Sequence, residues 1–444
     1  MRKKSSVAAI AFLLGFLQPV CGAPSDEVRA AVRYTANSIP QQQWQSSRFL
    51  SLANIPTEER AHVVAVLGFV LNSVGRSATL QKPTVAGDLV HVDLAALRIS
   101  SASWEALASD REPYFHVRTK VVDPATNKET VVFTDAGHVG LEKAAQLRLM
   151  TGSNGAILRA DWFIVRATTD HYYSLAAIPD TLAGWYASLG VDAKTISALA
   201  ANRGANIFRS GVTQKPRRVS RWQGPLGGVW NTYDSAATDD PRHDPFRFPG
   251  FDGAYDAGEF IATKANGMHA FALYNAAGKR QDSVPDAIAK DDSDPISDGR
   301  LVPMLSCVRC HVADGYRAFS NDQADLLKHL KGDDVDRLAA FYDTTRLSKE
   351  LTRDQEDYAA AVETATGGLT VKEMSAALAK IVREYSYEQV DAKDAARDLG
   401  ADGVGVFVVS SDPYLLALLD GKQINRAAWE ASFHEAATLT GAKP

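Results

Sequence analysis

Two cysteines and a histidine near residue 310 are the side chains best suited to chemistry in this 444-residue chain. They occur as Cys307-Val308-Arg309-Cys310-His311, the pattern C-x-x-C-H that attaches a c-type haem. Two cysteines three positions apart lie on one side of a helical turn, so both thiols can add to the vinyl groups of one porphyrin. The sequence therefore predicts one covalent haem c on Cys307 and Cys310, with His311 as the proximal iron ligand.

Three other uses of a C-x-x-C pair fit less well. A structural zinc site needs four Cys or His ligands, usually in two pairs, and the only other cysteine is Cys21. A thioredoxin-like pair follows a strand in a βαβ unit, whereas this pair follows an acidic, irregular segment. A disulfide between such close positions closes a very small loop and adds little stability. We therefore expect haem attachment.

The sequence offers several possibilities for the second axial ligand. Met304 is tethered beside the motif and is poorly placed to reach the other side of the ring. Met374 follows His311 by 63 residues and is the best-spaced thioether, although it also fits the apolar stripe of an ordinary helix. His329 is the next candidate, and a position that is open or filled by water is the remaining one. We predict Met374 as the distal ligand.

The first 23 residues have the features of a secretory signal peptide. Three basic residues at positions 2 to 4 precede an apolar run from residue 7 to residue 17, and the small residues Gly22 and Ala23 follow. The apolar run is too short to cross a bilayer. We therefore expect a cleaved signal peptide, a mature chain that begins at Ala23 or Pro24, and a periplasmic or secreted protein.

A lipid anchor on Cys21 is disfavoured, because Gln18 stands where lipoprotein signals prefer a small aliphatic residue. Removal of the signal peptide leaves Cys307 and Cys310 as the only cysteines, so no disulfide framework can stabilise the exported chain. No other apolar stretch approaches membrane length, so no transmembrane segment is expected.

The net charge bears on the partners of the protein. The whole chain is at −5, and loss of three positive side chains with the signal peptide brings the mature chain to about −8. This balance disfavours nucleic acid and anionic membranes as partners. It suits docking to a basic redox partner protein in the periplasm.

Residues 24–210 are predicted to form a mainly helical region. The run 57–74 is apolar on almost every side, which indicates a buried helix. The β-branched segments 117–123 and 130–133 flank turn residues and predict a pair of strands. The segment 159–168 has no clear period, and we predict a strand there. Other helices are expected at 25–39, 141–150, 181–189 and 193–202, with a strand at 89–94.

Residues 211–300 are predicted to be β-rich, because the composition changes to Trp, Tyr, Gly and Pro with alternating polarity. The clearest hairpin joins 259–265 to 268–274 through Asn266-Gly267, a pair that suits a type I′ turn. The acidic residues of this region, Glu259 among them, are expected in solvated turns rather than in a calcium site.

Residues 301–444 are predicted to be helical and look like a small cytochrome c domain, in which C-x-x-C-H opens the domain and later helices close over the ring. The fold class is thus α+β and multidomain, with a β-rich middle between helical regions. The expected helices are 322–330, 335–342, 353–364, 371–387, 392–399 and 425–437, with a short strand or buried loop at 406–409.

Several stretches resemble a group of secreted bacterial proteins, frequent in planctomycetes, that carry a single c-type cytochrome motif. The resemblance implies that the regions before the motif and the motif itself belong to one architecture, and it implies no substrate. The resembling stretches are Arg159-Ala160-Asp161-Trp162-Phe163, Gly228-Val229-Trp230-Asn231-Thr232-Tyr233-Asp234, Gly258-Glu259-Phe260, Asn266-Gly267, Gly278-Lys279-Arg280 and Leu305-Ser306-Cys307-Val308-Arg309-Cys310-His311.

These observations favour an exported mono-haem c-type cytochrome that carries single electrons between periplasmic partners, with residues 24–300 as a docking or scaffolding module. Covalent attachment keeps the haem bound where it cannot be resupplied. Two alternatives stay open: a haem enzyme of peroxidase or oxidase type with an open distal site, and a haem-based sensor or binding module. A filled sixth coordination position favours electron transfer, and an empty one favours the alternatives.

Overall fold

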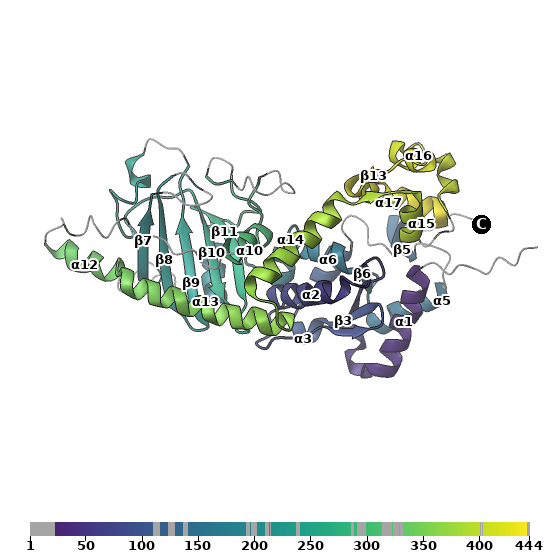
Figure 1. Ribbon diagram of the computed structural model, residues 1–444, viewed down its shortest axis with the longest axis horizontal. Helices are drawn as coiled ribbons and strands as arrows, with labels where there is room; N and C mark the ends of the chain where they lie inside the picture. Colours follow the sequence, from purple (N-terminus) through teal and green to yellow (C-terminus); the bar gives the residue numbers. More distant parts are fainter. Residues whose placement is uncertain are drawn as a thin grey trace, which may run out of the picture.

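The structure is a computed structural model and describes residues 23–109, 116–122, 129–135, 141–191, 202–208, 215–236, 240–285, 299–312, 332–399 and 403–441, with a few residues between these ranges. Helices occupy both ends of the chain and a sheet-rich part lies in the middle (Figure 1). The predicted mixture of helix and sheet along the chain is confirmed. The boundaries of the predicted domains stay predictions.

The N-terminal part contains a four-stranded sheet packed with helices. The strand order is β2-β3-β1-β6, and β1 pairs antiparallel with β3 and parallel with β6. Helix α2 is buried along most of its length and packs against α6, as its apolar sequence predicted. The elements of this part are α1 (Ala23–Ser38), η1 (Gln41–Ser46), β1 (Ser47–Ser51), α2 (Arg60–Val74), β2 (Thr84–Ala86), β3 (Leu89–Asp93), α3 (Leu94–Leu97) and α4 (Ser101–Ala108).

The following segments lead from this sheet to the middle of the chain. The predicted pair of strands near residue 125 is confirmed as the antiparallel pair β4 and β5. The helix predicted at 193–202 lies almost entirely outside the described residues. The elements are β4 (His116–Val122), β5 (Glu129–Asp135), α5 (Leu141–Thr151), β6 (Ile157–Arg159), α6 (Ala160–Thr168), α7 (Tyr172–Ala176) and α8 (Leu182–Ser188).

The strand predicted at 159–168 is wrong, because only Arg159 belongs to a strand and the rest forms helix α6. All nine residues of α6 are buried. A helix that is buried on every side shows no 3.6-residue period of hydrophobic residues in its sequence. The sequence pattern of a short buried helix therefore cannot be distinguished from that of a buried strand. The error therefore follows from the burial of this segment on every side.

A five-stranded antiparallel meander forms the middle of the molecule, with the order β11-β10-β9-β8-β7. It begins at Asn202, earlier than the predicted start of the β-rich region. Its strands are β7 (Asn202–Ile207), β8 (Arg217–Gly224), β9 (Gly227–Tyr233), β10 (Ala257–Thr263) and β11 (His269–Asn275), with the short helix η3 (Pro241–His243) between β9 and β10.

The predicted hairpin between β10 and β11 is confirmed, but its turn type was predicted wrongly. The N–H of Gly267 donates to the carbonyl of Lys264 at 2.9 Å, and φ is positive at Gly267 (81°) but not at Asn266. A type I′ turn needs positive φ at both central residues. The chain instead makes a three-residue loop whose glycine takes the left-handed conformation.

Helix α13 (Thr344–Thr366) covers one face of this sheet (Figure 1). Asp354 of α13 accepts hydrogen bonds from Arg221 Nε at 2.9 Å and from Trp230 Nε1 at 2.8 Å. A Cβ atom at Gly228 would lie 2.1 Å from Asp354 Oδ2, so glycine is needed for this close approach. The buried ion pair thus fixes α13 on the sheet.

The edge strand β11 is protected by two neighbouring tyrosines of α7. The hydroxyl of Tyr172 accepts the backbone N–H of Phe271 at 2.8 Å, and that of Tyr173 accepts the N–H of Leu273 at 3.0 Å. These groups on an edge strand would otherwise need water or another strand. The two hydroxyls therefore join the sheet to the N-terminal part.

The C-terminal helices follow the predicted order, and α14 has the predicted bounds. They pack against both earlier parts of the chain. Helix α13 contacts β7 and β9 of the sheet, and α13 and α14 contact α2 of the N-terminal part, where α14 also contacts α6. The helix predicted at 322–330 lies largely outside the described residues, and 406–409 belongs to a 3-10 helix. The elements are α10 (Leu305–Val312), α12 (Asp333–Phe341), α13, α14 (Val371–Tyr387), β12 (Gln389–Val390), α15 (Ala392–Leu399), η4 (Gly405–Val409), α16 (Pro413–Leu419), β13 (Ile424–Asn425) and α17 (Arg426–Gly441).

Among the described residues, no helix combines the length and apolar character that crossing a bilayer requires.

Lys264, in the β10–β11 turn, links the five-stranded sheet to α2. Its ammonium donates to the carbonyls of Asn72 at 2.9 Å and Ser73 at 2.6 Å, and also to the carbonyl of Gly75. The last carbonyls of a helix have no partner within the helix, and a positive charge there is favoured by the helix dipole. One side chain therefore satisfies the end of a buried helix from another part of the chain.

We expect Lys264→Met to lower the free energy of unfolding by about 2–4 kcal/mol, because it leaves buried carbonyls without donors. Urea-induced unfolding measures the change. Lys279→Met, at an exposed lysine in the turn that follows β11, is the matched control and should change stability by less than about 0.5 kcal/mol. Equal stabilities of the two variants would contradict this account of the link.

Candidate functional site

The predicted haem-binding residues lie together on helix α10, which packs against α14 beside the five-stranded sheet (Figure 1). Cys307 is buried, with 7% of its surface exposed, and Cys310 and His311 are half-buried. Cys307 and Cys310 are not joined in a disulfide. Neither sulfur is therefore consumed by a bond to the other.

The residue before α10 has an unusual backbone conformation. Met304 has φ of 66°, in the left-handed region that side chains with a Cβ rarely adopt, and it is fully buried. Its carbonyl accepts the N–H of Val308 at 2.7 Å, and Ser306 Oγ accepts the N–H of Val302 at 3.0 Å. These contacts hold a strained turn whose position sets the direction of the motif helix.

Glu259 of β10 contacts His311 directly. Its Oε2 lies 3.0 Å from His311 Nε2. Burial alone would raise the pKa of Glu259, but the charge and hydrogen bond of His311, together with a hydrogen bond from Cys307, lower it to about 2. Glu259 is therefore an ionised carboxylate that ties two residues of the motif to the sheet.

The contact of Glu259 with the motif was not predicted from the sequence, because this residue was expected in a solvated turn. The residue lies instead near the start of β10, where six of seven residues are uncharged. A single carboxylate inside an otherwise uncharged strand was the available signal, because such a group is rarely buried without a partner.

An arginine supports Glu259 from the neighbouring strands. Arg217 of β8 pairs with Asp234 through two contacts of 2.7 Å, and burial of Arg217 is outweighed by its carboxylate neighbours, which raise its pKa. The charge of Arg217 also interacts with Glu259 and lowers the pKa of that carboxyl group. The site thus holds alternating charges that compensate one another.

The buried Cys307 is poorly suited to act as a nucleophile. Burial raises the pKa of its thiol well above the ordinary value, and the charge of Glu259 raises it further. A catalytic cysteine needs a stabilised thiolate. The geometry therefore disfavours a cysteine enzyme that uses His311 as its base, although Cys307 and His311 lie close together.

His269 of β11 is a second buried histidine beside the motif. It pairs with Thr263 in the register, so its side chain lies on the same face of the sheet as Glu259. Its ring stacks on Tyr358 of α13, with ring centroids 3.9 Å apart. Burial, with a smaller contribution from the charge of His311, lowers the pKa of His269 to about 3. The imidazole is therefore neutral at physiological pH.

The sequence also missed His269, which is the first residue of the strand His269-Ala270-Phe271-Ala272-Leu273. A histidine beside a turn is ordinarily exposed, and only the register shows that it faces the sheet surface covered by α13. No local pattern signals this burial.

The three other candidate ligands are distributed differently. Met374 is fully buried on α14, the helix that packs against α10, and its role as distal ligand stays a prediction. Met304 lies on the chain immediately before α10, as expected. His329 lies outside the described residues.

The types of residue at this site are those that a covalent haem needs. Two thiols that form no disulfide and one imidazole share a helix. The hydroxyl of Tyr358, buried beside His269, has no hydrogen-bond partner. A buried hydroxyl without a partner is a group that an added polar ligand can satisfy. In the described part of the chain, no group of three or more His, Cys, Asp or Glu side chains has the arrangement of a site for a bare metal ion.

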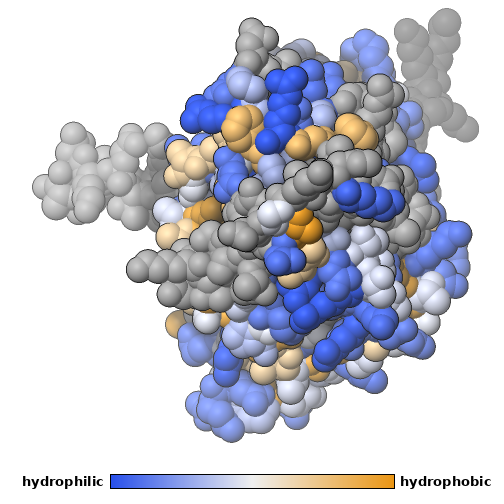
Figure 2. All heavy atoms as spheres, turned by 90° about the vertical axis from the view of Figure 1, so that its left-hand side faces the viewer, coloured by the Kyte–Doolittle hydropathy of each residue, from blue (hydrophilic) through white to orange (hydrophobic). Residues whose placement is uncertain are grey.

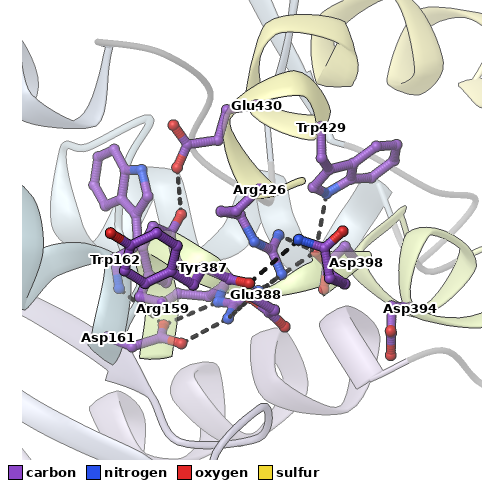
Figure 3. Close-up of polar contacts among 12 residues, drawn as sticks. Arg159, Asp161, Trp162, Tyr387, Glu388, Asp394, Asp398, Arg426, Trp429 and Glu430 are labelled. Atoms are coloured by element: carbon purple, nitrogen blue, oxygen red, sulfur yellow. Dashed lines mark hydrogen bonds and ion pairs between the residues drawn. The ribbon is translucent and has the colours of Figure 1, made fainter. Parts of the chain in front are cut away.

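A second cluster of charged residues links the N-terminal part of the fold to the C-terminal helices (Figure 3). Arg159 donates to Asp161 at 2.9 and 2.6 Å, and its guanidinium also reaches Asp398 and Glu388 at 3.4 Å. Arg426 of α17 donates to Asp398 at 2.9 Å and to Glu388. Both arginines are at most 2% exposed. We call these five residues the buried ion cluster.

The buried ion cluster connects β6 and α6 with α15, α17 and the end of α14. Trp429 Nε1 donates to Asp398 at 3.0 Å, and the guanidinium groups of Arg159 and Arg426 each lie 5.4 Å from the ring centroid of Tyr385. Opposite charges within the cluster compensate one another, so it needs no ligand to explain it. Its role in the fold is to hold the C-terminal helices on the N-terminal part.

Comparisons of the chain with protein-family models, with curated proteins and with solved structures gave no match.

We expect Arg426→Met to lower the free energy of unfolding by about 3–5 kcal/mol, because the buried Asp398 and the partly exposed Glu388 would share one cation fewer. Urea-induced unfolding measures this change. Arg353→Met removes an exposed ion pair with Asp357 and is the control, expected to cost less than about 1 kcal/mol. A small effect at Arg426 would show that the cluster does not hold the C-terminal helices.

Glu27 of α1 gives the fold a pH dependence. It is 6% exposed and accepts a hydrogen bond from Ser51 of β1. Burial raises its pKa from 4.5 to about 7, and the charge of Asp88 contributes to the increase. The native state then binds a proton more tightly than the unfolded state. This contribution to stability is complete below pH 4.5 and is lost as the pH rises to about 7.

We therefore expect Glu27→Gln to be more stable than the unmutated protein at pH 8 by up to about 3 kcal/mol, with a much smaller difference at pH 4.5. Urea-induced unfolding at both pH values gives the two differences. Glu58→Gln, at an exposed position, should show no such change with pH. A pH-independent difference for Glu27→Gln would refute the assignment.

Proposed function

We propose that the protein is an exported mono-haem c-type cytochrome that carries single electrons between periplasmic partners. The observation that carries the proposal is the C-x-x-C-H motif on one helix, with its two cysteines not joined in a disulfide and its histidine in contact with the carboxylate of Glu259. Cys307 and Cys310 would form the thioethers, and His311 would be the proximal ligand. The haem, when bound, supplies a one-electron couple.

Glu259 has a definite role in this proposal. In the structure it contacts Nε2 of His311, so iron ligation by that nitrogen would replace the contact. The carboxylate would remain in the site as a buried negative charge. Such a charge favours the more positive oxidation state of a neighbouring centre, so Glu259 would lower the reduction potential.

The surface supports docking through charge. The face in Figure 2 is covered mostly by hydrophilic side chains, and the apolar residues on it occur in small separate patches. With a mature net charge of about −8, electrostatic attraction to a basic partner is a suitable way to bring two redox proteins together briefly. The partner would be a periplasmic redox protein.

The haem assignment is tested by expression in a host with cytochrome c maturation. We expect haem stain to remain on the denatured polypeptide, and the mass of the intact protein to equal one haem plus a chain that begins at Ala23 or Pro24. Cys307→Ala combined with Cys310→Ala should remove all covalent haem, because no thiol would remain for a thioether. Ser348→Ala, at an exposed position of α13, is the control that should keep it.

Recovery of the unmutated chain without haem from such a host would overturn the proposal. A chain that retains Met1, or one acylated at Cys21, would refute the predicted processing and leave the haem assignment to be judged by the stain.

A further inference from the structure

We propose that His269 of β11 is the second axial ligand of the haem iron, opposite His311. This inference rests on the proposed function and deepens it, because it fills the coordination position that separates an electron carrier from an open haem enzyme.

The sheet register places His269 on the side of the motif. Glu259 pairs with Leu273 and Thr263 pairs with His269, so all four side chains lie on one face. Glu259 contacts His311 on that face. The charge of His311 contributes to the lowered pKa of His269, which agrees with this placement. Two imidazoles, from β11 and α10, therefore lie over the same face of the sheet.

The imidazole of His269 is oriented by aromatic neighbours. Its ring is nearly parallel to that of Tyr358, at an interplanar angle of 12°, and meets the ring of Phe271 edge-on at 6.1 Å. His269 is 3% exposed. A fixed ring loses little freedom when it binds a metal, which is the preorganisation that ligand residues need.

The surroundings of His269 also contain a polar group that lacks a partner. The hydroxyl of Tyr358 is buried and makes no hydrogen bond, although its ring lies directly against His269. A buried hydroxyl of this kind can be satisfied by a polar group that binds beside it. Tyr358 would donate to a polar group of the haem or to a water held beside it.

Methionines of the described chain provide weaker candidates than His269. Met374 belongs to the apolar side of α14, together with the buried Leu378 and Ile381, so ordinary core packing explains its position. Met150 belongs to α5, which packs against α1 at the opposite end of the molecule from the sheet (Figure 1). His269, in contrast, is a buried polar ring on the sheet face that carries Glu259.

Histidine ligation has a functional consequence. A thioether ligand raises the potential of a c-type haem, so two histidines give a lower potential than a histidine and a methionine. A buried carboxylate at Glu259 acts in the same direction. The protein would therefore release electrons to partners of higher potential.

The test uses the full-length holoprotein. The unmutated ferrous protein should have a low-spin spectrum and bind no carbon monoxide. His269→Ala should become high-spin and bind carbon monoxide, and added imidazole should restore the low-spin spectrum, since it replaces the lost ligand. His62→Ala, at an exposed histidine on α2, is the control and should behave like the unmutated protein. Restoration by imidazole separates loss of a ligand from general damage to the fold.

Near-infrared magnetic circular dichroism of the unmutated ferric protein gives a second answer that does not depend on a variant folding. The charge-transfer band should have the position of a bis-histidine haem. A histidine–methionine band, carbon monoxide binding by the unmutated protein, or a low-spin spectrum in His269→Ala would each overturn the inference. If haem is bound in all three proteins, the first or the third of these results leaves the proposed function intact, whereas carbon monoxide binding by the unmutated protein favours a haem enzyme or sensor over an electron carrier. An unmutated chain without haem overturns both.

Discussion

The contact between Glu259 and His311 connects the motif helix to the five-stranded sheet, and the rest of the site depends on where β10 lies. Strand β10 is held between β9 and β11, and β11 in turn is closed at its outer edge by the hydroxyls of Tyr172 and Tyr173. The same α7 tyrosines belong to the N-terminal part. A residue that contacts the predicted cofactor site is thus positioned by segments from almost the whole length of the chain.

Buried charged side chains make polar contacts with other segments of the chain throughout the molecule. Asp354 accepts a hydrogen bond from Arg221, and Lys264 donates to the carbonyls at the end of α2. The buried ion cluster links the N-terminal part to the C-terminal helices. An unpaired charge in the interior costs several kcal/mol, so each of these groups fixes the position of its partner. The three parts of the chain therefore do not pack as independent bodies with smooth apolar surfaces. Specific polar contacts set their relative positions.

The sequence predicted those elements whose pattern reflects one exposed and one buried side. Helix α14 alternates in this way and was predicted with its bounds, and the β10–β11 hairpin was found from its Asn-Gly pair. Helix α6 was missed because it is buried all round. The motif residues of the site were predicted from spacing alone. Glu259 and His269 were not, because their importance depends on a strand register that no local pattern encodes.

The burial of Cys307 bears on the order of folding and thioether formation in the proposed haem protein. In the folded chain only 7% of this residue is exposed, and Glu259 together with burial keeps its thiol protonated. Thioether formation needs an accessible thiol, so a folded chain would present Cys307 poorly to a haem. Attachment before α10 docks on β10 avoids this obstacle. The Glu259–His311 contact then belongs to the chain without haem, and exchange of that contact for iron would couple cofactor binding to the final packing of α10 against the sheet.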